Sequence, residues 1–327
     1  MHPPGSLGWL KALTAEMAGS AVTSVSAPGG RGRRSVRVEL EDGRTLIATQ
    51  RETAERGRNE AGLLGTLAAQ GAPVPHVIGF RDGLMLQADA GRNRLSNALV
   101  RADIRGRVDL LRRAIAALDA CRAAMTQRPD VLAQLPGLGT HTGWIENFVA
   151  RAVFLSGDLR IGPPPMDVDA VTRALSAPPD RFTRWDARTG NAVVQADGRI
   201  IWYDWNVFGR RGGVEDVSFL LADLYADVPV ADWMDLLAEA VPDAPARDLV
   251  RRMAIFVAVD RLRLIHGTVL AKGWADPRDT QRHDLVGAVP DLVEGLCSRM
   301  AGLAEDDPLL DGFTDWFTAA SRALTEA

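Results

Sequence analysis

The chain has 327 residues, of which 46% are hydrophobic and 24% are charged, so it suits a globular protein with room for two lobes or domains. Its 38 basic and 42 acidic residues give a net charge of −4, which excludes the basic footprint of a nucleic-acid-binding protein. No apolar run reaches the roughly 18 residues of a membrane span, and the N-terminus lacks the pattern of a secretion signal. We therefore expect a cytoplasmic protein without a membrane partner.

The first 90 residues predict a small lobe of mixed secondary structure. The alternating segments around Glu41–Gly43 are typical of a β-hairpin, and an apolar stripe with Gly71 as its stop is typical of a helix. In chain order, the predicted elements are a helix at 6–18, strands within 22–40 and 43–51, a helix at 52–70 and strands within 73–80 and 83–91.

The remainder of the chain, residues 91–327, predicts a larger lobe that is mostly helical. One β-hairpin, with its turn at Asp197–Gly198, interrupts the helices. The predicted helices are 105–126, 142–155, 167–175, 214–227, 230–240, 246–271, 279–303 and 311–325. The expected fold class is therefore α+β with two lobes. Cys121 and Cys297 lie far apart in predicted helices, and we expect both to be buried, reduced thiols.

The most informative segment is residues 184–204, RWDARTGNAVVQADGRIIWYD. Asp186 lies on a polar loop, Asn191 ends that loop, and Asp204 ends the second strand of the hairpin that follows. Because the two strands pair, Asn191 and Asp204 are expected to meet at one end of the hairpin. A carboxylate that accepts a hydroxyl proton, with an amide and a second carboxylate that bind Mg²⁺, is the set that phosphoryl transfer requires. Asp and Asn residues also cap turns, so the spacing alone leaves a purely structural role open.

The same segment resembles the family of aminoglycoside phosphotransferases and choline-kinase-like small-molecule kinases, which have a protein-kinase-like fold. RWDARTGN stands where that family has HGDLxxxN, and YDWNVFGRRGGVEDVSFLLAD stands where it has its DW or DF motif, a glycine-containing loop and a helix. The resemblance implies that Asp186 is the catalytic base and that Asn191 and Asp204 are the Mg²⁺ ligands. It implies a catalytic loop at 184–191 and a metal-binding hairpin at 192–205.

The resemblance extends weakly into the N-terminal lobe and implies an ATP site there. The glycine-rich stretch near residue 30 would cover the phosphates, the helix at 52–70 would supply a carboxylate, and the strand before residue 90 would hydrogen-bond adenine through its backbone. The residues assigned to the nucleotide in this way are Gly29, Gly30, Gly32, Ala48, Gln50, Glu60, Leu86 and Ala88.

The phosphate-binding lysine of the family is missing. Gln50 occupies its expected position, and a neutral amide cannot supply the charge of lysine. Arg51 is adjacent, but a shift of one residue along a strand reverses the side chain's direction. Either a bulge or a different register would bring Arg51 to the site; otherwise Glu60 lacks its expected partner.

The catalytic loop also departs from the family. Arg184 and Trp185 replace His-Gly before the catalytic aspartate; Arg184 would act as a hydrogen-bonding scaffold, and Trp185 either packs or lines the acceptor site. Arg188 would steady the transferring phosphoryl group, although a solvent-facing arginine is an equal alternative. Asp216 would support the loop by resemblance, and it is equally suited to cap a helix at 217–227.

The acceptor of the phosphoryl group is expected to bind in the helical lobe. Trp144, Trp205 and Asp223 are the candidates to line its site, although tryptophans at helical spacing are often part of a core. An aminoglycoside site would require several carboxylates, and Glu215, Asp223 and Asp227 are available. The spacing of four residues between Asp223 and Asp227 is, however, also typical of a solvated helix face.

The sequence therefore predicts an ATP- and Mg²⁺-dependent phosphotransferase that acts on a hydroxyl of an aminoglycoside, sugar or amino alcohol. A catalytically silent nucleotide- or ligand-binding protein of the same fold is the alternative. A third possibility is an unrelated helical protein in which the Asp-x4-Asn spacing arises by chance.

Overall fold

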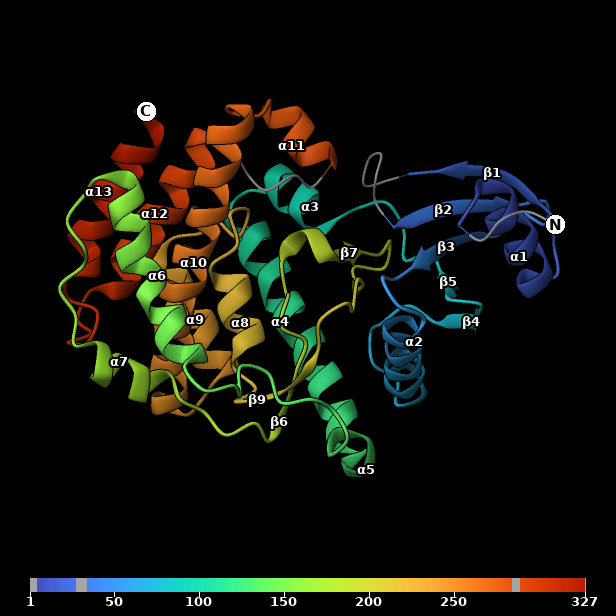
Figure 1. Cartoon of the computed structure of the whole chain (residues 1–327), viewed down its shortest axis with the longest axis horizontal. Helices are drawn as coiled ribbons and strands as arrows, with labels where there is room; N and C mark the ends of the chain where they lie inside the picture. Colours follow the sequence, from blue (N-terminus) through green and yellow to red (C-terminus); the bar gives the residue numbers. More distant parts are fainter. Residues whose placement is uncertain (1–4, 28–33, 284–288, 327) are drawn as a thin grey trace.

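A computed structural model describes residues 5–27, 34–283 and 289–326 of the chain. Figure 1 shows a small lobe built on a sheet, in blue, beside a larger helical part in green to red. The sheet is antiparallel, with strand order β1-β2-β3-β5-β4. Its elements, with the two helices of this lobe, are α1 (Leu7–Ala18), β1 (Val22–Ser26), β2 (Ser35–Leu40), β3 (Thr45–Gln50), α2 (Ala54–Ala69), β4 (Val77–Arg81) and β5 (Leu84–Ala88).

The two faces of this sheet bury different side chains, because successive residues of a strand point to opposite sides. On one face Leu46, Ala48 and Leu86 form a small core with Leu13 of α1. On the other face Met85 belongs to the main core, together with the leucines of α2. Residues of β3 with odd numbers therefore point away from α1 and toward the rest of the molecule.

The helical part contains two further short sheets, in which β6 pairs with β9 and β7 pairs with β8. Its strands are β6 (Arg181–Thr183), β7 (Ala192–Val194), β8 (Ile200–Trp202) and β9 (Gly209–Arg211), and a 3-10 turn, η1, covers Thr189–Asn191. Its helices are α3 (Leu95–Arg101), α4 (Ile104–Thr126), α5 (Pro129–Leu132), α6 (Trp144–Leu159), α7 (Val168–Leu175), α8 (Glu215–Leu221), α9 (Val230–Ala240), α10 (Ala244–Lys272), α11 (Pro277–His283), α12 (Pro290–Ala304) and α13 (Phe313–Thr325).

Side-chain caps explain where several helices begin. Asp103, Asp167 and Asp243 each accept a backbone N–H from the third residue that follows, at 2.8, 3.0 and 2.9 Å, and so begin α4, α7 and α10. Each cap stabilises its helix by about 1 kcal/mol. The prediction of one helix over 279–303 is wrong, because α12 begins at Pro290, a residue that is favourable in a first turn but breaks a helix interior.

The core of the helical part surrounds α10, whose Phe256 is fully buried and packs against Phe148 of α6 and Phe313 of α13. Burial of a side chain of this size contributes roughly 1.5–3 kcal/mol. Cys121 and Cys297 are both buried and unpaired, as expected. Burial raises the pKa of each thiol to about 12, so neither is a reactive thiolate at neutral pH. In the described part of the chain, no helix combines the length and apolar character needed to cross a membrane.

Candidate active site

A buried carboxylate fixes the start of the loop between β6 and β7. Asp216 accepts the backbone N–H of Arg184 at 3.0 Å and that of Trp185 at 2.9 Å. Trp185 has a φ of 71°, a left-handed conformation that few non-glycine residues adopt, so these bonds hold a strained position. Because α8 begins at Glu215, Asp216 lies inside its first turn. The alternative role as the cap of a helix at 217–227 is therefore wrong.

The loop brings Asp186, Arg188 and Asn191 into contact. Nε of Arg188 donates to Oδ1 of Asp186 at 2.8 Å, and Nδ2 of Asn191 donates to Oδ2 of Asp186, also at 2.8 Å. Asn191 donates a second bond to the Asp186 carbonyl at 3.1 Å, which fixes the loop across five residues. Burial acts to raise the pKa of Asp186, but Arg188, followed by Arg184 and Arg261, outweighs burial and holds the pKa below its ordinary value. Asp186 is therefore a carboxylate at neutral pH.

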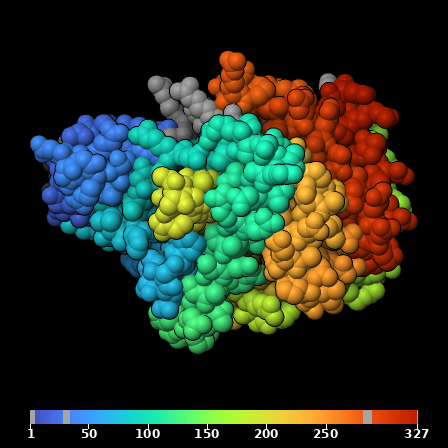
Figure 2. All heavy atoms as spheres, turned by 180° about the vertical axis from the view of Figure 1, so that it is seen from behind, coloured from blue at the N-terminus to red at the C-terminus, as the bar shows by residue number. Residues whose placement is uncertain are grey.

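The hairpin of β7 and β8 places Asp204 beside this loop. Ala192 of β7 pairs with Trp202 of β8, and beyond that pair the Tyr203 N–H donates to the Asn191 carbonyl at 3.0 Å. Asn191 and Asp204 therefore lie at the same end of the hairpin, as the sequence predicts. In the space-filling view from behind, the hairpin region, in yellow, reaches the surface between the cyan strands and the teal α3–α4 segment (Figure 2).

A buried arginine connects the loop to Asp204. Arg184, which is 1% exposed, donates to the carbonyls of Tyr203 and Asp204, the latter at 3.1 Å. Its guanidinium lies over the rings of Trp202 and Trp205, with its carbon 4.9 and 5.0 Å from their centroids. Asp204 has a φ of 59°, and these bonds hold that left-handed backbone in place. Arg184 is thus the hydrogen-bonding scaffold that the sequence led us to expect.

The cation that the sequence lacked at Gln50 is supplied by Arg51. Its guanidinium forms two hydrogen bonds with Glu60 of α2, at 2.5 and 2.6 Å, and a third with Oδ1 of Asp204 at 2.7 Å. Burial acts to lower the pKa of Arg51, but Glu60 and Asp204 hold it above its ordinary value. The assignment of Gln50 to the lysine position is therefore off by one residue, and Arg51 occupies that position. Arg51 directly follows β3, and like the odd-numbered residues of that strand it points away from α1.

The same change of register affects the assignment of Ala48, whose side chain faces the core beneath α1 and cannot form a wall of a site that contains Arg51. Leu86, whose backbone was expected to bind adenine, lies inside the sheet, where it pairs with Ala48 of β3 and Gly79 of β4. The backbone N–H of Ala88 is already donated to the His76 carbonyl at 2.8 Å. Gly29, Gly30 and Gly32 lie outside the described residues.

Two of the three residues expected at the acceptor site are instead structural. Trp205 is fully buried, stacks on Phe182 and donates its Nε1–H to the Trp202 carbonyl at 2.8 Å. Asp223 is 6% exposed and accepts both the backbone N–H of Thr189, at 3.2 Å, and its hydroxyl, at 2.7 Å. Asp223 therefore supports the middle of the loop between β6 and β7, as Asp216 supports its start.

The donor atoms fit a magnesium ion that binds together with a nucleotide. Asp204 and Asn191 supply a carboxylate and an amide oxygen at one end of the hairpin. Among the described residues no cluster of three or more His, Cys, Asp or Glu side chains could hold a metal by itself. Mg²⁺ typically takes one or two carboxylates and completes its shell with water and substrate phosphates, so this small donor set suits it.

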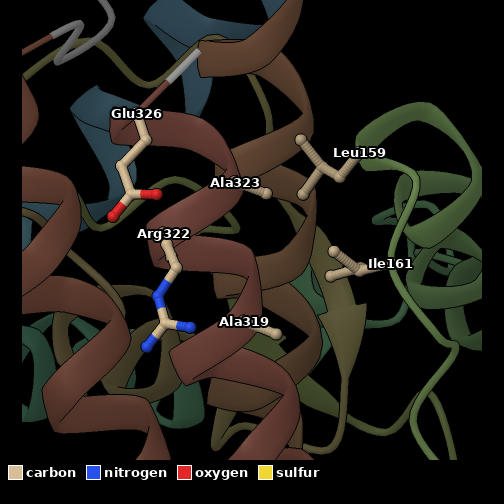
Figure 3. Close-up of a pocket in the computed structure, with 6 residues that line it drawn as sticks. All are labelled: Leu159, Ile161, Ala319, Arg322, Ala323 and Glu326. Carbon is tan, nitrogen blue, oxygen red and sulfur yellow. The ribbon is translucent and has the colours of Figure 1, made fainter.

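The structure also contains a shallow groove far from this loop, between the end of α6 and α13 (Figure 3). It has a volume of about 410 Å³ and is lined by Leu159, Ile161, Ala319, Arg322, Ala323 and Glu326. It includes none of the residues that the sequence singled out.

If Asp186 acts as a general base, its ion pair with Arg188 predicts a measurable pH effect. Arg188→Gln removes the largest favourable charge on Asp186, so its pKa should rise. A general base works only when it is deprotonated, so the acidic limb of the kcat/KM profile should move to higher pH. Arg199→Gln, which removes an exposed arginine paired with Asp197 on the hairpin turn, is the matched control and should leave the profile unchanged. An unshifted limb in Arg188→Gln would contradict this electrostatic role.

Comparison with solved structures places this geometry in a known fold. Choline kinase LicA from Streptococcus pneumoniae aligns at a TM-score of 0.51 and 12% identity, covering 89% of this chain and 98% of that one. Macrolide 2'-phosphotransferase MphH from Brachybacterium faecium gives 0.51 and 14%, over 87% and 97% of the two chains. Amicoumacin kinase hAmiN, in complex with AMP-PNP and Ca²⁺, gives 0.52 and 13%, over 85% and 88%.

No family model matches the sequence, and no curated protein matches it either. At identities of 12–14% the structural matches establish the fold. The order of the five strands, the helix after β3 and the long helical region agree with that result. The expected fold class is thus confirmed, and the chain has the protein-kinase-like α+β fold of the small-molecule kinases.

Proposed function

We propose that this protein is an ATP- and Mg²⁺-dependent phosphotransferase that acts on a hydroxyl of a small polar molecule. Its two lobes would be residues 1–90, which bind the nucleotide, and residues 91–327, which hold the catalytic loop and the acceptor. The observation that carries the proposal is the Arg51 guanidinium, which contacts Glu60 of one lobe and Asp204 of the other. This contact provides a charged group in place of the lysine that the sequence lacks at Gln50.

Each residue has a defined role in the proposed reaction. The acceptor oxygen attacks the γ-phosphorus of ATP, the bond from that phosphorus to the leaving ADP oxygen breaks, and the hydroxyl proton passes to Asp186. Asn191 and Asp204 would hold Mg²⁺, which would supply positive charge to the phosphate oxygens. Arg51 would bind the phosphates of the nucleotide, and Arg188 would steady the transferring group. Asp216, Asp223 and Arg184 keep the loop in the required shape.

The proposal is tested by ATP consumption in the presence of sugars, amino alcohols and aminoglycosides, with Asp186→Ala assayed in parallel. We expect Mg²⁺-dependent turnover with at least one acceptor and its loss in Asp186→Ala. If no acceptor gives turnover but Mg²⁺-ATP still raises the melting temperature, the silent nucleotide-binding protein is the better description. If neither effect is found, the proposal fails.

A further inference from the structure

One hydrogen bond connects the small lobe directly to the candidate metal ligand. Nη2 of Arg51 donates to Oδ1 of Asp204 at 2.7 Å, although the two residues lie 153 positions apart in the chain. The Arg51 side chain is 11% exposed, whereas that of Asp204 is 40% exposed. Solvent therefore reaches the carboxylate, but one of its oxygens is held by a guanidinium. We call this contact between Arg51 and Asp204 the Arg51 latch.

Glu60 keeps the guanidinium of the latch in place. Arg51 donates Nε to Oε2 of Glu60 at 2.5 Å and Nη2 to Oε1 at 2.6 Å. Both N–H groups of Nη2 are therefore in use, one on Glu60 and one on Asp204. Within the residues that the structure describes, the two N–H groups of Nη1 make no hydrogen bond. Arg51 can thus remain attached to Glu60 while its other N–H groups bind the oxygens of a ligand.

The latch competes with a divalent cation for Asp204. Of the two candidate ligands, Asn191 offers only a neutral amide oxygen, so Asp204 is the charged one that Mg²⁺ requires. Glu60 offsets the charge of Arg51, but it does not release the Asp204 oxygen from its bond. A cation at Asp204 must therefore displace the guanidinium or share the carboxylate with it. A nucleotide changes this balance, because its phosphates are alternative partners for the guanidinium and additional ligands for the metal.

We propose that Arg51 withholds Asp204 from divalent cations in the nucleotide-free protein, so that the metal enters together with the nucleotide. This inference rests on the proposed function and specifies how its site is filled. A nucleotide that draws Arg51 away from Asp204 raises the affinity for the metal, and the metal raises the affinity for the nucleotide by the same factor. Arg51 therefore weakens the binding of the metal alone and strengthens the binding of the nucleotide.

The test measures the binding of Mn²⁺, which takes the same oxygen ligands as Mg²⁺, to the full chain without nucleotide. Electron paramagnetic resonance reports the concentration of the free ion. The main variant combines Arg51→Gln with Glu60→Gln. It removes one positive and one negative charge, so the net charge around Asp204 is unchanged and no buried carboxylate loses its partner.

We expect the double variant to bind Mn²⁺ about fivefold or more tightly than the unmodified protein, because Asp204 is released from its bond; a factor of this size is typical of coupled ligands. Arg51→Gln alone should change the affinity in the same direction. Equal or weaker binding of Mn²⁺ in these variants would overturn the inference.

Two further variants locate the metal and test for a general effect. Asp204→Asn, added to the double variant, should abolish the gain in Mn²⁺ affinity; a gain that survives would place the metal elsewhere and overturn the inference. Arg37→Gln is the matched control, because Arg37 is a buried arginine of the same sheet whose bonds go to Asp89, at 2.5 Å, and to Gly91. It should bind Mn²⁺ as the unmodified protein does. An equal gain in Arg37→Gln would show that any released carboxylate attracts the ion, which would also contradict a specific role of Arg51.

Calorimetry with metal-free AMP-PNP on the same samples separates this outcome from that of the proposed function. The double variant should bind the nucleotide more weakly than the unmodified protein, which is the opposite of its effect on Mn²⁺. A gain in Mn²⁺ affinity without nucleotide binding to any sample would support the latch and count against the phosphotransferase. Nucleotide binding and turnover without a gain in Mn²⁺ affinity would do the reverse.

Discussion

Arg51→Gln is expected to lower kcat/KM for phosphoryl transfer by about 10²–10³-fold, the loss typical when one preorganised group that stabilises transition-state charge is removed. The Arg51 side chain hydrogen-bonds both Glu60 and Asp204, and the variant removes these bonds. It also leaves Glu60, which is 2% exposed, without its ion-pair partner. Steady-state kinetics and the affinity for Mg²⁺-ATP would measure the effect.

Two matched variants make this result specific. Gln50→Ala changes the neighbouring residue, which points to the other face of the sheet, and should preserve kcat/KM within a few fold. Arg51→Lys keeps the charge but cannot form the paired bonds with Glu60, so it should recover part of the activity. A severe loss in Gln50→Ala together with normal activity in Arg51→Gln would show that Gln50, and not Arg51, serves the nucleotide.

Asp186→Asn is expected to lower kcat by about 10²–10⁴-fold, the usual contribution of a positioned general base. Its single amide oxygen can accept only one of the two hydrogen bonds that Arg188 and Asn191 donate to separate oxygens of Asp186, but the bond from Asn191 to the backbone carbonyl of residue 186 remains, so the loop should keep its shape. Nucleotide binding should therefore change little while turnover is lost. The measurement is kcat with the best acceptor, together with the melting temperature in Mg²⁺-ATP.

Asp197→Asn is the control for this substitution, because Asp197 lies on the exposed hairpin turn and pairs with Arg199. It should behave as the unmodified protein. Undiminished kcat in Asp186→Asn would remove this carboxylate from the chemistry, whereas a loss of nucleotide binding as well would assign it a structural role.

The order of elements and the central triplet could be predicted because both depend on local pattern. Alternating strands and apolar stripes mark the lobes, and a tight hairpin requires residues at its two open ends to meet. The proximity of Asn191 and Asp204 follows directly from that geometry, whereas Asp186 is assigned from the order of the residues and from the family resemblance. The structural resemblance to small-molecule kinases supports the same interpretation at the level of the fold.

The assignment of Gln50 illustrates what local pattern cannot decide. A sequence motif locates a functional residue only to within one position. In a strand, a shift of one position reverses the direction in which the side chain points. The correct parity depends on which face of the sheet is covered by α1, and that is a contact between distant segments. The signal that could have resolved it was Glu60, whose buried carboxylate needs a cation that Gln50 cannot supply.

The predictions that Trp205 and Asp223 line the acceptor site were wrong for a related reason. A tryptophan or an aspartate beside a catalytic motif has the right chemistry for a ligand, but the sequence does not show whether the core or the loop already uses it. Trp205 is stacked on Phe182, and Asp223 is bonded to Thr189. The buried ion pair of Arg211 with Glu215 could not be predicted either, because the partners of Arg211 come from separate segments that no spacing rule connects.

Calorimetric binding of AMP-PNP with and without Mg²⁺, to the unmodified protein and to Asp204→Ala, tests the central claim most directly. If Asn191, Asp204 and Arg51 form a nucleotide-metal site, the unmodified protein will bind AMP-PNP more tightly with Mg²⁺, and Asp204→Ala will lose that dependence. No binding, or equal binding under all four conditions, would contradict the claim.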